Sequence, residues 1–254
     1  MRKTNNKNRI GEENYNTNGT LMKIIEYNGW KDVVVEFQDD YKYQTHVIYT
    51  NFKNGQVKNL YDKEIFGIGF IGKGIYNHQK DKKAYNVWRS MLQRCYDPYY
   101  INQFPTYKDC IVIEEWHNFQ NFAKWFYDNY YEISNEKMCL DKDILYKGNK
   151  IYSPNTCCFV PNKINMLFVT NKNKRGNLPV GVSQKCKAGG YQCTCSTING
   201  NIIYLSTFKN IRSAWLMYKM NKELIIQSVA DEYKDLIPKK LYLAMYNYKV
   251  EISD

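Results

Sequence analysis

Two acidic residues and two asparagines between Leu140 and Asn165 have the types and spacing of a small metal-dependent hydrolytic site. Asp141 or Asp143 ends an apolar segment, where a carboxylate can bind a hard divalent cation or take a proton from water. Asn155 lies in the loop that follows, where its backbone can orient that base. A cation held by Asp141 and Asn165 would then generate hydroxide and hold a phosphate ester for attack.

Three elements must position these residues: a strand before Asp141, a turn within "GNKIYSPN", and a helix that opens in "VPNKIN". The intervening "CCFV" is expected to be a core strand. Upstream, "KKAYNVWRSMLQRCY" and "HNFQNFAKWFYDNYY" carry apolar residues at helical spacing, and "YKDCIVIEEW" predicts a strand between them. The second of these helices has an aromatic stripe that we expect to lie in the core: Phe119, Phe122, Trp125 and Phe126.

Over about residues 80–170, the motifs "WRSMLQRCY", "LDKD", "GNKIYSPNTC" and "NKIN" resemble phage-encoded HNH homing endonucleases. Where that family usually has an acid and then a histidine, this chain has Leu140 and then Asp141. Asn155 and Asn165 match the loop and helix asparagines of the family. The resemblance implies a ββα-metal core with three catalytic residues, Asp141, Asn155 and Asn165. It also implies that Asp141 and Asn165 bind Mg²⁺ or Mn²⁺ in an active enzyme.

The replacement of histidine by Asp141 leaves the activity open. A carboxylate with an ordinary pKa of about 4 is a weaker base at neutral pH than imidazole. The chain is therefore either a nuclease that nicks DNA or a non-catalytic scaffold. The nearest histidine in sequence, His117, opens a helix and is expected at the surface.

The basic residues of the chain are concentrated in one part of it. The net charge is +11, from 36 basic and 25 acidic residues, which favours a polyanionic partner. From Asn171 to Lys222 there are nine basic residues and no acidic one, as a phosphate-binding surface requires.

Three short strands and a helix are predicted in this basic part: "VGVSQK", "GYQCTCST" and "NIIYLSTF", then "NIRSAWLMYKMNKELIIQSVADEY". Gly189-Gly190 and Asn199-Gly200 supply the two turns. Side chains alternate along a strand, so the cysteines of "YQCTCST" should face the helix. Its polar residues would then face DNA, with two lysines of the preceding loop near phosphates.

The same segment, over about residues 178–233, resembles the plant-type APETALA/ethylene-response DNA-binding domain. The matching features are Gly181-Val182, Tyr191, "LSTF", and Ala214 with Tyr218 on the helix. The resemblance implies readout of double-stranded DNA by the sheet. Together with the charge pattern, it predicts these DNA-binding residues: Lys172, Lys174, Arg175, Lys185, Lys187, Gln192, Thr194, Ser196, Lys209 and Arg212.

Other features fix the rest of the domain organisation. Residues 1–18 are polar and basic, and predict a disordered arm. Residues 19–72 predict a small all-β module, with hairpin turns at Asn28-Gly29 and Asn54-Gly55. Residues 80–170 form the HNH-like core, and residues 178–254 the DNA-binding domain. The eight cysteines include no CxxC pair, so no zinc is expected. No apolar run is long enough for a membrane span, and no secretory signal is visible.

We therefore expect an α+β protein of the cytoplasm of a bacterial host, encoded by a phage or prophage. The leading hypothesis is sequence-directed binding of double-stranded DNA, with or without metal-dependent nicking. A DNA-binding regulator without catalytic activity is the second hypothesis. A phage factor that binds and inhibits a host defence protein is the third.

Overall fold

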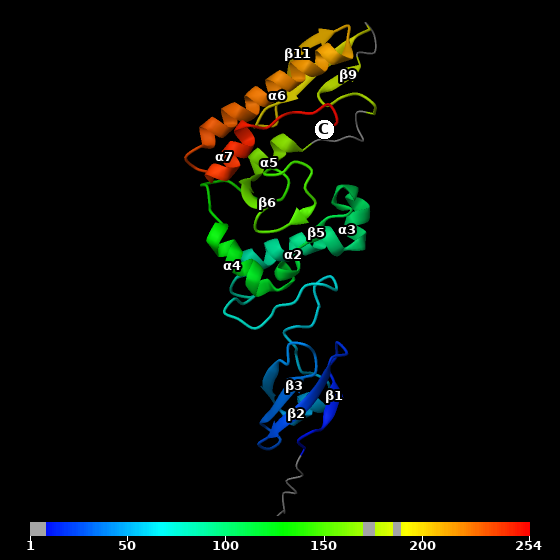
Figure 1. The fold of residues 1–254 in the computed structure, drawn as a ribbon, viewed down its shortest axis with the longest axis vertical. Helices are drawn as coiled ribbons and strands as arrows, with labels where there is room; N and C mark the ends of the chain where they lie inside the picture. The colour runs from blue at the N-terminus through cyan, green and yellow to red at the C-terminus, as the bar shows by residue number, and fades with distance from the viewer. Residues whose placement is uncertain (1–8, 170–175, 185–188) are drawn as a thin grey trace, which may run out of the picture. The chain divides into compact units, whose positions relative to one another are not determined.

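A computed structural model describes residues 9–169, 176–184 and 189–254 of the chain (Figure 1). It contains both helices and antiparallel sheets, so the predicted α+β class is confirmed. The chain divides into two compact units, Met1–Tyr127 and Asp128–Asp254. This boundary falls inside the segment 80–170 that we predicted as one core. No helix of the described residues is long and apolar enough to cross a membrane.

The first unit begins with an antiparallel sheet in the order β1-β2-β3-β4. Its strands are β1 Glu13–Tyr15, β2 Leu21–Tyr27, β3 Val33–Phe37 and β4 Gln44–Val47, and the short helix α1 Tyr49–Lys53 follows. Alternate residues of β2 and β3 point into a small core, to which α1 adds one aromatic ring. That core consists of Met22, Ile24, Val33, Val35, Phe37, Phe52 and Val57.

Two predictions for this module were wrong. The segment predicted as a disordered arm, 1–18, contains β1, which pairs with β2 from Glu13 to Tyr15; residues 1–8 lie outside the described residues. A three-residue strand of polar character carries no β-branched pattern, so its pairing is not visible in the sequence. Asn54-Gly55 is no hairpin turn but ends α1, where Gly55 has a φ of +70° and lies close to the carbonyl of Tyr15.

The rest of the first unit is mainly helical. Its elements are α2 Lys82–Tyr96, α3 Pro98–Gln103, the 3₁₀ turns η1 Pro105–Tyr107 and η2 Glu114–His117, and β5 Ile111–Val112. Helix α4 Phe119–Asn129 follows, and the boundary after Tyr127 falls within its last turn. The indole N–H of Trp88 donates to the carbonyl of Trp116 at 2.7 Å. Phe119, Phe122 and Phe126 are buried, so the predicted core role of the α4 stripe is confirmed for these three rings.

The second unit begins with strands and a helix in the order expected for the predicted site. Strand β6 Met138–Asp141 pairs antiparallel with β8 Cys158–Pro161, and α5 Asn162–Phe168 follows directly. The short strand β7 Ile151–Tyr152 lies between them in the chain.

A three-stranded antiparallel sheet in the order β11-β10-β9 completes the second unit, with helix α6 packed on it (Figure 1). The strands are β9 Val182–Gln184, β10 Tyr191–Ser196 and β11 Ile202–Phe208, and the helices are α6 Ile211–Tyr233 and α7 Lys239–Tyr246. Asn210 starts α6, since its side-chain oxygen accepts from the backbone N–H groups of Arg212 and Ser213. This arrangement agrees with the predicted sheet packed on one helix.

Candidate nucleic-acid interface

Asp141 ends β6 and organises the loop that follows. Its Oδ1 accepts the backbone N–H of Asp143 at 2.8 Å and that of Ile144 at 2.7 Å. This is the way in which an aspartate closes a turn on its own backbone. Burial raises the pKa of Asp141, and the two amide hydrogen bonds oppose that shift.

The neighbouring charged residue Lys142 is buried in the same loop. Its Nζ lies 2.5 Å from Oδ1 of Asp143 and 2.9 Å from the carbonyl oxygen of Asn149. The amide of Asn149 in turn donates to the carbonyls of Lys142 and Ile151, at 2.9 and 2.7 Å. The side chains of the loop are therefore largely engaged with the loop itself, including the second candidate carboxylate, Asp143.

Neither asparagine of the predicted site makes a hydrogen bond to the carboxylate of Asp141 in the described part of the chain. Asn155 is exposed in a turn that Ser153 holds, while Asn165 is partly buried on α5. Among the described residues, both hydrogen bonds to the Asp141 carboxylate come from backbone amides. Leu140 is only 5% exposed, so its side chain is part of the hydrophobic core.

These residues fit a divalent cation poorly. Mg²⁺ prefers about six oxygen ligands in near-octahedral geometry. Oδ1 of Asp141 accepts backbone hydrogen bonds, and Asp143 forms an ion pair with Lys142. Asn165 could offer a cation only the neutral oxygen of its amide. In the part of the chain that the structure describes, no three His, Cys, Asp or Glu side chains gather as a metal site. The function proposed for the chain therefore involves no metal step.

Two adjacent cysteines on or beside β8 are buried next to this loop. The pKa of Cys157 is raised to about 12, mainly by burial and to a smaller extent by the nearby charge of Asp141, while hydrogen bonds with Ser153 and Thr156 oppose the shift. Burial, and to a smaller extent the charge of Asp141, also raises the pKa of the Cys158 thiol. Thiols held neutral in this way are neither nucleophiles nor metal ligands.

The C-terminal sheet has one face covered by α6. Val182, Cys193 and Cys195 are buried there against Ala214 and Tyr218. The prediction that the β10 cysteines face the helix is therefore confirmed. A sheet with one covered face presents the remaining side chains of its strands on the other face.

That other face, the outer face, presents hydroxyl and amide groups. Gln192 of β10 lies opposite Ser183 of β9 and Thr207 of β11, because paired residues share a face. Thr194 lies opposite Tyr204, whose hydroxyl is 2.9 Å from Oγ1 of Thr207. We define the outer face by Ser183, Gln192, Thr194, Tyr204 and Thr207.

Tyr204 and Thr207 were missed in the sequence. The register of β10 and β11 shifts between Cys193 and Thr194, which inserts Leu205 as an extra residue in β11. This irregularity breaks the alternation of "NIIYLSTF", so a strict period of two assigns its faces wrongly. The 56% exposure of Tyr204 marks it as the largest polar group of the outer face.

Ser196 was predicted to face DNA, and in the structure its hydroxyl has a partner on α6. Its hydroxyl lies 3.4 Å from Nζ of Lys222, a residue of α6 that is only 5% exposed. Burial lowers the pKa of Lys222, and the nearby Cys195 thiol opposes the shift. Ser196 therefore provides a polar partner for a buried ammonium group.

Two of the predicted phosphate-binding cations are exposed at the end of the sheet, Lys209 and Arg212. Lys219 instead pairs with Glu223 at 2.7 Å. Several predicted DNA-binding residues lie outside the described residues: Lys172, Lys174, Arg175, Lys185 and Lys187.

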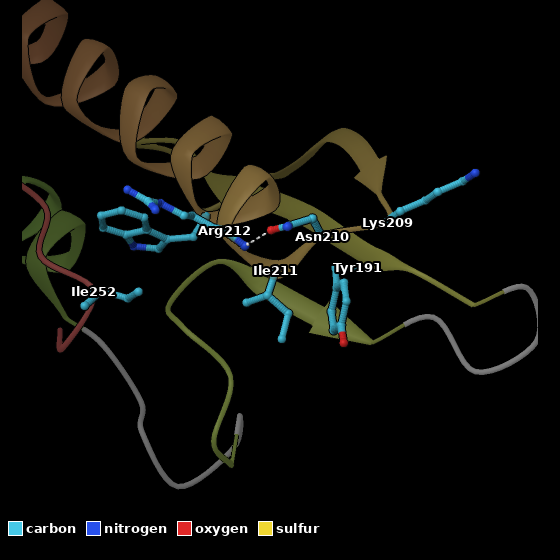
Figure 2. A pocket seen from close by; sticks show the side chains of 7 residues that line it. Tyr191, Lys209, Asn210, Ile211, Arg212 and Ile252 are labelled. Atoms are coloured by element: carbon cyan, nitrogen blue, oxygen red, sulfur yellow. Dashed lines mark hydrogen bonds between the residues drawn. The ribbon is translucent and has the colours of Figure 1, made fainter.

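A cavity of about 680 Å³ lies at the start of α6 (Figure 2). Tyr191 of β10 and Ile211 of α6 project into it side by side, with Ile252 on the C-terminal segment. Trp215 and the two exposed cations complete its lining, together with Asn210. The aromatic residues of this cavity were not predicted, because they are far apart in the sequence.

Comparison with known proteins found no matching family model, no matching curated protein and no matching solved structure. The two resemblances seen in the sequence therefore remain predictions.

Proposed function

We propose that the chain binds double-stranded DNA in a sequence-directed way through the outer face of β9, β10 and β11. The observation that carries this proposal is the difference between the two faces of the sheet. One face is covered by α6, and the other presents hydroxyl and amide side chains, with no carboxylate among its described residues.

The outer face has the chemistry that base edges require. The amide of Gln192 can donate to and accept from adenine in the major groove, and the hydroxyls of Thr194 and Tyr204 can do either. A small antiparallel sheet is narrow enough to enter that groove. Lys209 and Arg212, at the end of β11 and the start of α6, can bind the flanking phosphates.

A selection of duplexes from a random pool by the full chain, followed by gel shift, tests the proposal. We expect the natural chain to enrich one sequence. In the Gln192→Ala and Tyr204→Ala variants, the ratio of affinities for that sequence and for single-base variants of it should fall by about tenfold. Lys234→Ala is the matched control, because Lys234 is exposed at the far end of α6. No enrichment and no shift at low salt would overturn the proposal.

The same material tests strand cleavage. Supercoiled plasmid carrying the selected sequence should be bound and stay uncut with Mg²⁺ or Mn²⁺, because Asp141 is engaged with its own loop. Nicking that Asp141→Ala and Asn165→Ala both abolish would establish a metal-dependent nuclease instead.

A further inference from the structure

Helix α6 carries apolar side chains on two faces. One face packs on the sheet, and on the opposite face Leu216, Met220 and Leu224 are 43%, 61% and 60% exposed. Each of these three follows a buried residue of the helix by two positions, which turns an α-helix by about 200°. They are spaced by four residues, so they form one continuous ridge, which we call the exposed ridge. A contiguous apolar ridge at the surface indicates an interaction site.

The two ends of the exposed ridge carry opposite charges. Arg212 is exposed in the first turn of α6, and among the described residues it makes no ion pair. Asp231 and Glu232 are exposed in the last turn. The C-cap residue, Lys234, is followed at once by Asp235, so this end of the helix stays negative.

This arrangement of charge is unfavourable within a single helix. The dipole of an α-helix places partial positive charge at its N-terminus and partial negative charge at its C-terminus. In α6, all of which the structure describes, the first turn has no acidic residue and the last turn has no basic one. The side-chain charge at each end is therefore repelled by the dipole, and a partner that brings the opposite charge to both ends would relieve this repulsion.

A second copy of α6 in antiparallel orientation complements both the ridge and its ends. A twofold axis that crosses the helix between Met220 and Leu224 brings Met220 of each chain onto Leu224 of the other. It also brings Arg212 of each chain beside Asp231 of the other, because both residues lie about 14 Å from the axis along the helix. The hydroxyl of Tyr242 donates to Oδ1 of Asp231 at 3.0 Å and so orients this carboxylate.

We propose that the chain forms a twofold-symmetric dimer through the exposed ridge, with the two α6 helices antiparallel. A polyanion such as DNA would be attracted at Arg212 and repelled at Asp231, and a cationic partner would meet the reverse, whereas an antiparallel copy matches both ends. One helix face is smaller than the roughly 800 Å² per partner of a standard interface, so we expect dissociation in the micromolar range. Helix α6 lies between this ridge and the sheet, so the dimer leaves the outer face free and goes beyond the proposed function.

Sedimentation equilibrium of the full chain, without DNA, tests the proposal. We expect the natural chain to pass from monomer to dimer as its concentration rises. Met220→Glu puts a carboxylate at the centre of the interface and should weaken the dimer at least about tenfold. Ile202→Glu is the matched control, because Ile202 is an apolar residue of β11 that is 75% exposed, and it should leave the dimer unchanged.

Reversed charges test the antiparallel order. Arg212→Glu and Asp231→Arg should each weaken the dimer at least about tenfold, because each variant brings like charges together at both ends of its own dimer. An equimolar mixture of the two variants restores opposite charges at both ends, so it should form a mixed dimer within about twofold of the natural affinity. Within one chain the two positions are about 29 Å apart along the helix, too far to pair with each other.

Glu232→Arg is the matched control for Asp231→Arg. It makes the same change in the same turn of α6, but its side chain points about 100° away around the helix. We expect it to weaken the dimer much less. Recovery in the mixture also excludes a folding defect as the cause of the losses in the single variants.

Three results would overturn the proposal. A chain that stays monomeric over the whole concentration series has no such dimer, and a dimer that Met220→Glu leaves intact uses another surface. A mixture that associates no better than Arg212→Glu or Asp231→Arg alone excludes the antiparallel order. Because no DNA is present in these experiments, none of these results bears on the proposed function.

Discussion

In the loop after β6, Oδ1 of Asp141 lies 2.7 Å from the backbone nitrogen of Ile144 and accepts its hydrogen. The same oxygen accepts the N–H of Asp143. The residue that stands in the predicted catalytic position therefore acts on the conformation of its own loop, which is a sufficient physical reason for an aspartate there.

Two substitutions of Asp141 separate its hydrogen bonds from its charge. Asparagine keeps an acceptor oxygen in place, whereas alanine leaves the two amides without one. We expect Asp141→Ala to lower the free energy of unfolding by about 1–3 kcal/mol and Asp141→Asn to change it much less. Denaturant unfolding of the full chain measures both. Equal losses in the two variants would show that the charge matters and the acceptor does not.

The raised pKa of Asp141 also predicts a pH dependence. Because burial raises this pKa in the folded state, the folded state binds the proton more tightly than the unfolded state does. Stability from this residue is present below the unfolded pKa, about 3.9, and is lost as the pH rises through the folded pKa. Asp141→Asn should remove that decline, which unfolding curves of both proteins at a series of pH values will reveal. If the free energy of unfolding declines with pH equally in Asp141→Asn and in the natural chain, the charge of Asp141 is not buried.

The pH dependence of stability expected from Lys222 has the opposite sign to that from Asp141. Burial lowers its folded pKa, so its stabilising effect is present above the unfolded pKa of about 10.4 and is lost as the pH falls through the folded pKa. At neutral pH, Lys222→Met should therefore raise the free energy of unfolding by about 1 kcal/mol. It should also flatten the rise of stability between neutral pH and about pH 10.

Lys234→Met is the control for this substitution, because it makes the same change at an exposed position, the C-cap of the same helix. Denaturant unfolding at several pH values compares the two variants. A loss of stability in Lys222→Met would mean that its contact with Ser196 outweighs the cost of burial.

The salt dependence of DNA binding counts the phosphate contacts. Under the proposed function, Lys209→Ala and Arg212→Ala should each lower the slope of log K against log salt by about 0.9. Gln192→Ala should weaken specific binding and leave this slope unchanged, since it removes a base contact. Fluorescence anisotropy with a labelled duplex gives the slopes. Equal slopes in all three variants would exclude Lys209 and Arg212 from the phosphate contacts.

The alternation of residue types along the chain correctly predicted those features of the fold that depend only on neighbouring residues. The alternation of Cys193 and Cys195 sufficed to place β10 on α6, because a strand has a fixed period. The role of Ser196 depends instead on Lys222, which approaches from α6, 26 residues further along the chain. The exposure of Tyr204 depends on the bulge between β10 and β11, which cannot be recognised from the residue types of either strand.

The candidate site shows the same difference between residue type and contact. Asp141 was found because an acid at a strand end is visible in the sequence, but its partners are backbone amides, which residue types do not reveal. Tyr191 and Trp215 line one cavity only because β10 and α6 pack together.

Gly181 and Gly200 form a matched pair for testing the packing of β9 on α6. Both have a positive φ, +76° and +78°, so alanine is strained at either position. At Gly181 a Cβ would also lie 2.0 Å from the ring of Tyr218, whereas at Gly200 it would meet nothing within 4 Å. Gly200→Ala should therefore cost about 1 kcal/mol, and Gly181→Ala about 3 kcal/mol or more.

A double-mutant cycle with Tyr218→Ala isolates this contact. Once the ring is removed, Gly181→Ala should cost only the backbone strain, about as much as Gly200→Ala in the natural chain. Unfolding followed by the fluorescence of Trp215, with the first-unit tryptophans replaced by phenylalanine, reports on the second unit alone. If Gly181→Ala costs the same with and without the ring, Tyr218 does not approach Gly181 in the folded chain, and the sheet is not held on α6 at that point.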